Sequence, residues 1–239
     1  MKTMNKENNE IVFKVEINEG LANAIRRYVN QIQILAIDEV EISKNDSPLY
    51  DETIAHRVGL IPLKMDGKIH EKNKITLKLN SKKEGYVYSE ELHGGLDVVY
   101  KKIPITSLNK GQELVLTATT RIGTGSEHAK FSPGLIHYRN IANIKIPKNC
   151  LKEVTNSCPK NILKIKEDKI VVEDSEKCDL CEACVDFCKK EGKDLIELEP
   201  TKELIITIES FGQIEADEIF NKSIETLKKD LAHISKNLK

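Results

Sequence analysis

The chain has 239 residues, of which 39% are hydrophobic and 31% are charged, a size that suits one large domain or about two to three small ones. Its 37 basic and 38 acidic side chains leave a net charge of −1, so we expect no direct sequence-specific contact with nucleic acid. No apolar run reaches the roughly 18 residues that a membrane span needs. The hydrophilic first residues, without an apolar signal segment, predict a cytoplasmic protein.

Residues 1–44 predict a strand–helix–strand unit. Residues 11–17 alternate as in a strand, whereas the apolar side chains of residues 21–29 lie on one helical stripe. A second strand is predicted at 34–42, and turn-forming residues follow it at 43–48.

Residues 45–147 predict a β-rich insert domain. Short alternating runs at 75–79, 96–100 and 113–118 are separated by Gly, Asn and Pro, which favour turns. The segment 51–59 has helical spacing instead, and it ends at a glycine that suits a helix C-terminus.

We find no catalytic constellation in the sequence, and we expect no catalytic residue in this chain. The spaced glycines of residues 123–125 resemble a phosphate-binding loop, but Pro133 argues against the helix that such a loop requires. We therefore expect a structured turn between strands. Acidic pairs begin at Asp38, Asp51 and Glu90, and because neighbouring side chains point apart we expect them to be solvated or to cap helices.

Residues 148–199 form a cysteine-rich module that predicts an iron–sulfur site. Cys178, Cys181 and Cys184 have the spacing of a loop that wraps a cluster. Cys158 precedes a proline, and in two-cluster ferredoxins such a pair supplies the fourth thiolate to the cluster of the other motif. The same register upstream of Cys158 holds no further thiol. We therefore expect one cluster, 4Fe-4S in preference to 3Fe-4S, held by these four cysteines.

Other arrangements of the module stay open at this point. Four-cysteine zinc sites usually come as two separated pairs, which makes zinc the less favoured alternative. Cys188 lacks a following proline; it is a free buried thiol, a substitute ligand in place of Cys158, or one half of a redox-made disulfide with Cys150. A hairpin is predicted at 162–172, between Cys158 and the cluster loop.

Residues 200–239 predict a strand at 204–209 and a long helix at 214–238. The apolar residues of this helix recur at intervals of four and three: Phe220, Ile224, Leu227, Leu231, Ile234 and Leu238. Such a narrow seam favours packing against one other helix. An amphipathic helix that lies on the chain's own sheet is the alternative.

Three segments, residues 20–27, 36–40 and 51–63, closely resemble the family of the D-type subunit of archaeal DNA-directed RNA polymerase. They are also similar to the third-largest subunit of eukaryotic RNA polymerase II and, more distantly, to the amino-terminal domain of the bacterial alpha subunit. The resemblance covers nearly the full length, including residues 123–133 and the cysteine module, which some archaeal members carry.

The resemblance implies an α+β fold with a discontinuous dimerisation domain. In the family, the segments corresponding to 1–44 and 200–239 form this domain, while the β-rich insert domain (45–147) and the ferredoxin-like iron–sulfur module (148–199) lie between them. The cluster would staple a module that is too small to build a good core alone.

By the same resemblance, the chain is a non-catalytic assembly-platform subunit, and an enzyme only as part of the nucleotidyltransferase complex. It would form a heterodimer with the smaller L-type subunit and organise the two large catalytic subunits and the small subunits N and P for transcription. The seam residues of the last helix, with Ile25 and Tyr28, would face the L-type subunit, and His56, Arg57 and Gly59 would face a large subunit. The alternatives are a one-cluster ferredoxin-like redox protein fused to a protein-binding domain, and a homodimeric scaffold.

Overall fold

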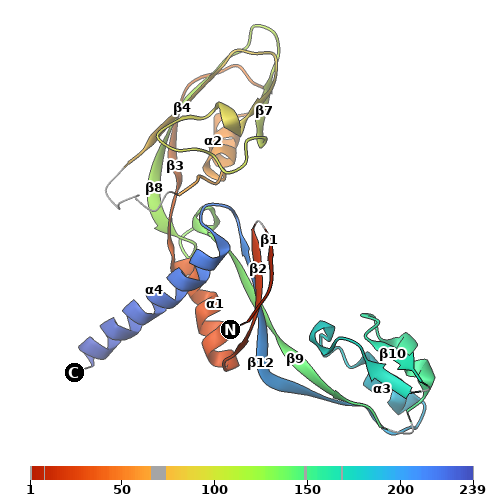
Figure 1. Cartoon of the computed structure of the whole chain (residues 1–239). Helices are drawn as coiled ribbons and strands as arrows, with labels where there is room; N and C mark the ends of the chain where they lie inside the picture. Colours follow the sequence, from red (N-terminus) through yellow and green to blue (C-terminus); the bar gives the residue numbers. More distant parts are fainter. Residues whose placement is uncertain (1, 8, 66–73, 148–149, 168, 239) are drawn as a thin grey trace. The chain divides into compact units, whose positions relative to one another are not determined.

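The computed structural model describes residues 2–7, 9–65, 74–147, 150–167 and 169–238. The chain divides into two compact units, and several strands and helix α1 run from one unit into the other. Figure 1 shows the order of the elements along the chain.

The first unit comprises Met1–Asn5, Val12–Ala22 and His137–Thr207. Its sheet has the order β1-β2-β12-β9, so strands from the beginning of the chain pair with strands that follow far along it (Figure 1). The four strands are β1 (Lys2–Glu7), β2 (Glu10–Glu16), β9 (Gly134–Lys145) and β12 (Glu197–Ser210). The strand predicted at 11–17 is confirmed as β2, whereas β1 was not predicted because its sequence, KTMNKE, lacks apolar alternation.

The cysteine module of this unit is built from short elements: η4 (Lys152–Ser157), β10 (Leu163–Lys166), β11 (Lys169–Val172), η5 (Ser175–Lys177) and α3 (Ala183–Lys190), where η marks a 3₁₀ helix. Strands β10 and β11 pair antiparallel, which confirms the predicted hairpin; Asp168, between them, lies outside the described residues. The buried core of the module is small: Ala142, Val154, Ile162, Leu163, Cys178, Cys188 and Ile196.

The second unit comprises Lys6–Ile11, Asn23–Ile136 and Ile208–Lys239. It holds a sheet of order β3-β8-β4-β6 and a two-stranded sheet of β5 and β7. Its strands are β3 (Gln33–Asn45), β4 (Thr76–Ser81), β5 (Gly85–Tyr88), β6 (His93–Gly94), β7 (Pro104–Leu108) and β8 (Leu114–Thr124). Helix α2 (Asp51–Gly59) has the bounds predicted for it and buries Ile54 and Val58 in a core that Leu77, Leu116 and other strand residues complete.

Two predicted strands of this unit need correction. Strand β3 continues to Asn45, because residues 43–45, predicted as a turn, pair with β8 after a shift in register between Ile42 and Lys44. The run 96–100 was predicted as a strand because its apolar and polar residues alternate. It is not a strand, since it makes only an isolated bridge from Val98 to Leu63.

Helices α1 (Glu19–Tyr28) and α4 (Ala216–Asn237) confirm the two remaining predicted helices. The Asn18 side chain accepts a hydrogen bond of 2.7 Å from the N–H of Leu21 and so caps the start of α1. The first turns of α4 bury Ala216, Ile219 and Ser223 and pack against η1 (Val29–Gln31), which follows α1.

Gly134, at the start of β9, is a site where a single methyl group should be costly. A Cβ there would overlap the carbonyl oxygen of Glu209 and stand 2.8 Å from the Cδ1 atom of Ile219. We expect Gly134→Ala to lower the free energy of unfolding by about 2 kcal/mol, measured by thermal or urea unfolding. Gly59→Ala is the control, since its Cβ would lie 3.8 Å from the nearest atom. Equal stability of the two variants would contradict this packing.

Candidate functional site

Four cysteine side chains line one small cavity in the module. Cys158, Cys178, Cys181 and Cys184, the predicted ligands, surround a space of about 20 Å³. The rest of the lining is mostly apolar: Ile144, Ile162, Leu163 and Leu198, with Lys160, Asp179 and Glu182. The structure therefore brings together the four thiols that the spacing singled out, although Cys158 lies 20 positions before Cys178, the first of the other three.

The local backbone explains this convergence. Cys158 directly follows η4 and Cys178 directly follows η5, while Cys184 lies in the first turn of α3. On either side of Cys181, Leu180 (φ 56°) and Glu182 (φ 60°) adopt the left-handed conformation, which side chains other than glycine rarely take. These two residues curl the loop, and turns of this kind aim N–H groups at negative charge in many iron–sulfur sites.

Backbone N–H groups and burial act in opposite directions on the pKa of the cavity thiols. The backbone N–H of Leu180 acts to lower the pKa of Cys178, and the backbone N–H of Val185 acts in the same way on Cys184. Burial nonetheless raises the pKa of Cys178, and it raises the pKa of Cys184 to about 11. Both thiols are therefore protonated near neutral pH, and a metal that binds them must displace the protons.

The donor set fits an iron–sulfur cluster. Thiolate sulfur is the ligand that binds such clusters, and the largely apolar lining suits a buried inorganic group. Four thiolates also suit one zinc ion, which they would hold at about 2.3 Å. Within the described ranges, no three or more His, Cys, Asp or Glu side chains stand in an arrangement that could hold a metal ion.

The two remaining cysteines lie beside each other, outside the cavity lining. The sulfur atoms of Cys150 and Cys188 are 4.0 Å apart, and Cys188 is fully buried. Burial first, and then the neighbouring Cys188, raise the pKa of Cys150 to about 11. As placed here, Cys188 faces Cys150 rather than the four candidate ligands.

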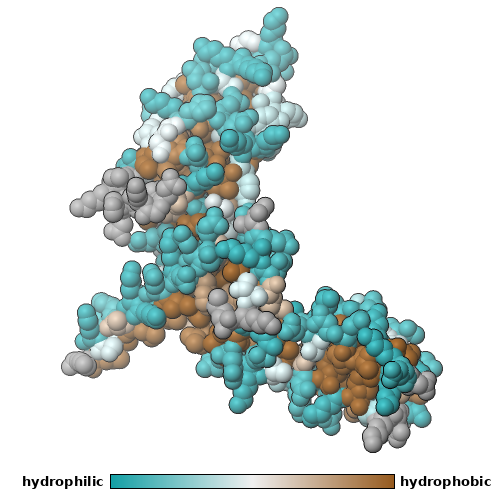
Figure 2. All heavy atoms as spheres, viewed as in Figure 1, coloured by the Kyte–Doolittle hydropathy of each residue, from teal (hydrophilic) through white to brown (hydrophobic). Residues whose placement is uncertain are grey.

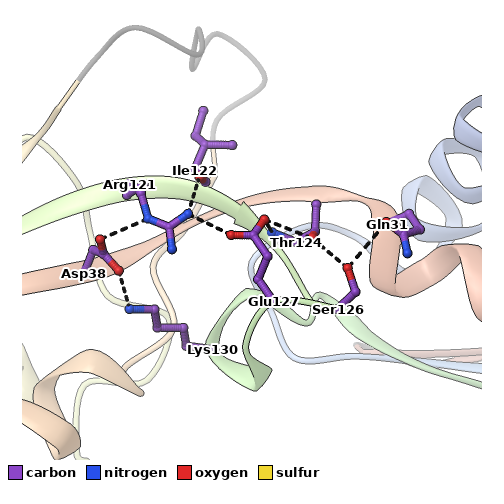
Figure 3. Close-up of polar contacts among 8 residues, drawn as sticks. All are labelled: Gln31, Asp38, Arg121, Ile122, Thr124, Ser126, Glu127 and Lys130. Atoms are coloured by element: carbon purple, nitrogen blue, oxygen red, sulfur yellow. Dashed lines mark hydrogen bonds and ion pairs between the residues drawn. The ribbon is translucent and has the colours of Figure 1, made fainter.

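A polar network on the second unit was missed by the sequence reasoning. Asp38 on β3 accepts hydrogen bonds from Lys130 on η3 (Ala129–Phe131, 2.7 Å) and from the Nε of Arg121 on β8 (3.0 Å) (Figure 3). Arg121 also pairs with Glu127 at 2.9 Å, and both cations lie over the ring of Phe131. Asp38 is exposed, as expected, and it is also the partner of two cations. The network fixes the predicted turn between β8 and β9.

The pKa of Asp38 is lowered, mainly by the hydrogen bond from Lys130 and then by Arg121. A carboxyl group with a lowered pKa stabilises the fold above its unfolded pKa of about 4, and this contribution is lost as the pH falls through the folded-state pKa. We expect Asp38→Asn to cost about 1 kcal/mol at pH 7 and progressively less in acid, measured by urea unfolding at several pH values. Glu84→Gln, at an exposed position, is the control. A deficit that persists undiminished at pH 2 would count against this account.

The apolar seam of α4 is half-buried in the first part of the helix and exposed in the last part. Phe220, Ile224 and Leu227 are half-buried, whereas Leu231 (56% exposed), Ile234 (51%) and Leu238 (82%) are open. Figure 2 shows hydrophobic residues along one side of this helix. The seam therefore does not lie on a sheet of the second unit over its full length.

The two residues of α1 that were predicted to face the same partner differ in how far they are exposed. Ile25 is only 4% exposed, because its own chain already covers it, so it has little surface to offer a partner. Tyr28 is half-buried, and its pKa is raised by desolvation and by the Asp230 carboxylate on α4. We therefore retain Tyr28 and not Ile25 in the candidate surface.

A second exposed surface lies at α2. His56 and Arg57 are exposed, and the Nη1 of Arg57 donates a 2.8 Å hydrogen bond to the carbonyl of Ile105, which orients the side chain. Gly59 ends the helix. Tyr50 (82% exposed) and Leu60 (45%) flank α2 and were not predicted as part of this surface. The large apolar residue at each end of the helix was the sequence signal that could have indicated them.

Comparison with known proteins assigns the class of protein. Residues 40–138 match the RNA polymerase Rpb3/RpoA insert domain. The chain is 31% identical to DNA-directed RNA polymerase subunit Rpo3 of Methanosphaera stadtmanae, covering 96% of this chain and 94% of the relative. For Rpo3 of Pyrococcus horikoshii the identity is also 31%, with 95% and 93% covered.

The similarity extends to eukaryotes, since DNA-directed RNA polymerase II subunit rpb3 of Dictyostelium discoideum is 28% identical over 95% of this chain and 91% of its own. The chain belongs to the Rpo3 family of DNA-directed RNA polymerase subunits, which confirms the resemblance seen in the sequence. None of the described helices is both long and apolar enough to cross a membrane.

Proposed function

We propose that this chain is the non-catalytic platform subunit on which a DNA-directed RNA polymerase assembles. The observation that carries the proposal is the exposed apolar seam at the end of α4, on a chain that matches polymerase subunits over nearly its whole length. By holding several partners on one surface, such a subunit lowers the entropic cost of bringing the catalytic subunits together. It would act in the cytoplasm, as part of a nucleotidyltransferase complex.

The proposed partners differ between the two exposed surfaces. A smaller L-type subunit would cover Tyr28 and the seam of α4, because a narrow seam suits one helix or helix pair. A large catalytic subunit would contact His56, Arg57 and Gly59, and the small subunits N and P would complete the platform. A homodimer through α4 is the competing arrangement. The ferredoxin-like redox alternative accounts for the cysteine module alone, whereas the family covers almost the entire chain.

We further propose that Cys158, Cys178, Cys181 and Cys184 hold one iron–sulfur cluster, 4Fe-4S in preference to 3Fe-4S, with zinc as the alternative. Support comes from the shared cavity, its apolar lining and the left-handed residues of the loop. When bound, the cluster would supply four metal–sulfur bonds that link η4, η5 and α3. Because the buried core of the module is small, these links would contribute to its folding outright.

Anaerobic affinity purification of the tagged chain from its own cells tests both proposals. We expect the large polymerase subunits and one small partner to co-purify, identified by mass spectrometry, and about four irons per chain. Iron without polymerase subunits would favour the redox alternative. Co-purification of polymerase subunits with one zinc per chain would support the platform function but show that zinc, not a cluster, occupies the cysteine site. A stable dimer of the chain without any partner would favour the homodimeric scaffold.

A further inference from the structure

The turn that leads into Cys178 is anchored from the sheet by a single arginine. Arg139 on β9 is half-buried, and its Nη1 donates hydrogen bonds to the carbonyl oxygens of Glu176 (2.5 Å) and Cys178 (3.4 Å). One guanidinium group therefore holds the backbone of a candidate ligand and of the turn before it. Arginine suits this task, because its donors are held rigidly in one plane and it keeps its charge.

A second cation reinforces the same turn. Lys14 on β2 contacts Glu176 at 3.5 Å and Glu203 on β12 at 2.8 Å. With 24% of its side chain exposed, Lys14 is less buried than a core group, and ion pairs at such positions are individually weak. Arg139 is thus the principal anchor and Lys14 a secondary one.

The turn has its own internal hydrogen bonds, so the role of Arg139 is to place it. The Asp174 side chain accepts from the N–H of Glu176 at 3.1 Å, and the N–H of Cys178 donates to the carbonyl of Ser175 at 3.1 Å. These bonds shape the turn but do not tie it to a strand. The two bonds from Arg139 do, one to Glu176 and the other to the candidate ligand Cys178, which is only 8% exposed.

We propose that Arg139 is a positioning residue that holds Cys178 against β9 and so slows loss of the cluster, an inference that rests on the cluster proposed above. Arg139 does not ligate metal; it acts through the carbonyl groups of Glu176 and Cys178. Partners of this kind, one bond removed from the ligand, typically alter metal retention by about tenfold to a hundredfold. The guanidinium charge also favours the negative charge of a thiolate-bound cluster.

The test compares three substitutions in the full chain, purified anaerobically with its partners. Arg139→Gln removes the charge and the forked donors, and Arg139→Lys keeps a charged donor. Lys145→Gln is the matched control, because Lys145 lies on the same strand but pairs with the exposed Glu197 at 3.1 Å and not with the turn. The rate at which a chelator removes iron is followed by the loss of visible absorbance.

We expect Arg139→Gln to lose iron about tenfold faster than the wild type, Arg139→Lys to recover most of this difference, and Lys145→Gln to match the wild type. Hydrogen exchange gives a second readout: the amides of Glu176 and Cys178 should exchange faster in Arg139→Gln, whereas those of α3 should not. Wild-type rates of iron loss in Arg139→Gln, with iron present in both, would overturn the role of Arg139 and leave the cluster standing. Absence of iron from the wild type would overturn both. Equally fast iron loss in Lys145→Gln would also overturn the role of Arg139, since the loss of any positive charge on β9 would then have the same effect.

Discussion

Leu231→Asp combined with Ile234→Asp should eliminate the small partner and the large polymerase subunits from an affinity purification of the chain. Both side chains are about half exposed, so the substitutions remove little of the chain's own core. In a helix–helix interface, however, each carboxylate would be desolvated without a partner. We expect binding to weaken at least about a hundredfold, which corresponds to about 3 kcal/mol.

The control is a pair of substitutions that alters net charge by the same amount on the other side of α4. Lys229→Gln with Lys236→Gln removes two positive charges, as two new aspartates add two negative ones, and both lysines lie off the seam. This pair should co-purify with its partners as the wild type does. Quantitative mass spectrometry measures both, and circular dichroism checks that α4 still forms. Normal recovery of polymerase subunits by the aspartate variant would rule out the α4 seam as the partner surface.

Cys181→Ser combined with Cys184→Ser should reduce the iron content from about four per chain to nearly none. A serine hydroxyl is a much weaker ligand to an iron–sulfur cluster than a thiolate, and two such replacements remove half of the ligand set. The Cys181 side chain is exposed and Cys184 is half-buried, so the loss of packing is modest and the loss of metal dominates. Without the links among η4, η5 and α3, we also expect faster proteolysis within residues 150–199 and weaker assembly with the polymerase.

Cys150→Ala separates these effects from a general loss of thiols. Cys150 lies beside Cys188 and outside the cavity lining, so this variant should keep its iron and its resistance to protease. Full iron content in the double serine variant would exclude the proposed ligand set. Loss of iron with unchanged assembly would instead show that the cluster is dispensable for the platform.

Local patterns predicted the local parts of this molecule. Helix α2 was predicted with its observed bounds, because helical spacing and a terminal glycine lie within nine residues. The convergence of Cys178, Cys181 and Cys184 was likewise encoded in one loop. The strand predicted at 96–100 was wrong. Alternating apolar and polar residues indicate one buried and one exposed face, but they do not show that a neighbouring strand is present to pair with.

Contacts between distant residues escaped prediction. Asp38 meets Arg121 and Lys130 only because β3 pairs with β8, and no spacing rule connects positions 83 or more residues apart. Arg139 reaches Cys178 for the same kind of reason, since β9 precedes the turn by most of the module. Exposure also required the fold: Ile25 and Leu231 have the same apolar character, but only Leu231 is left uncovered.

The strand order β1-β2-β12-β9 also constrains when the subunit can take shape during its synthesis. On the ribosome, β2 emerges early, but the strand beside it, β12, is translated only after the insert domain and the module. The β3-β8-β4-β6 sheet has all of its strands much sooner and is free to form first. Because α4 follows β12, the seam proposed to bind the small partner is translated last, after every strand of this sheet.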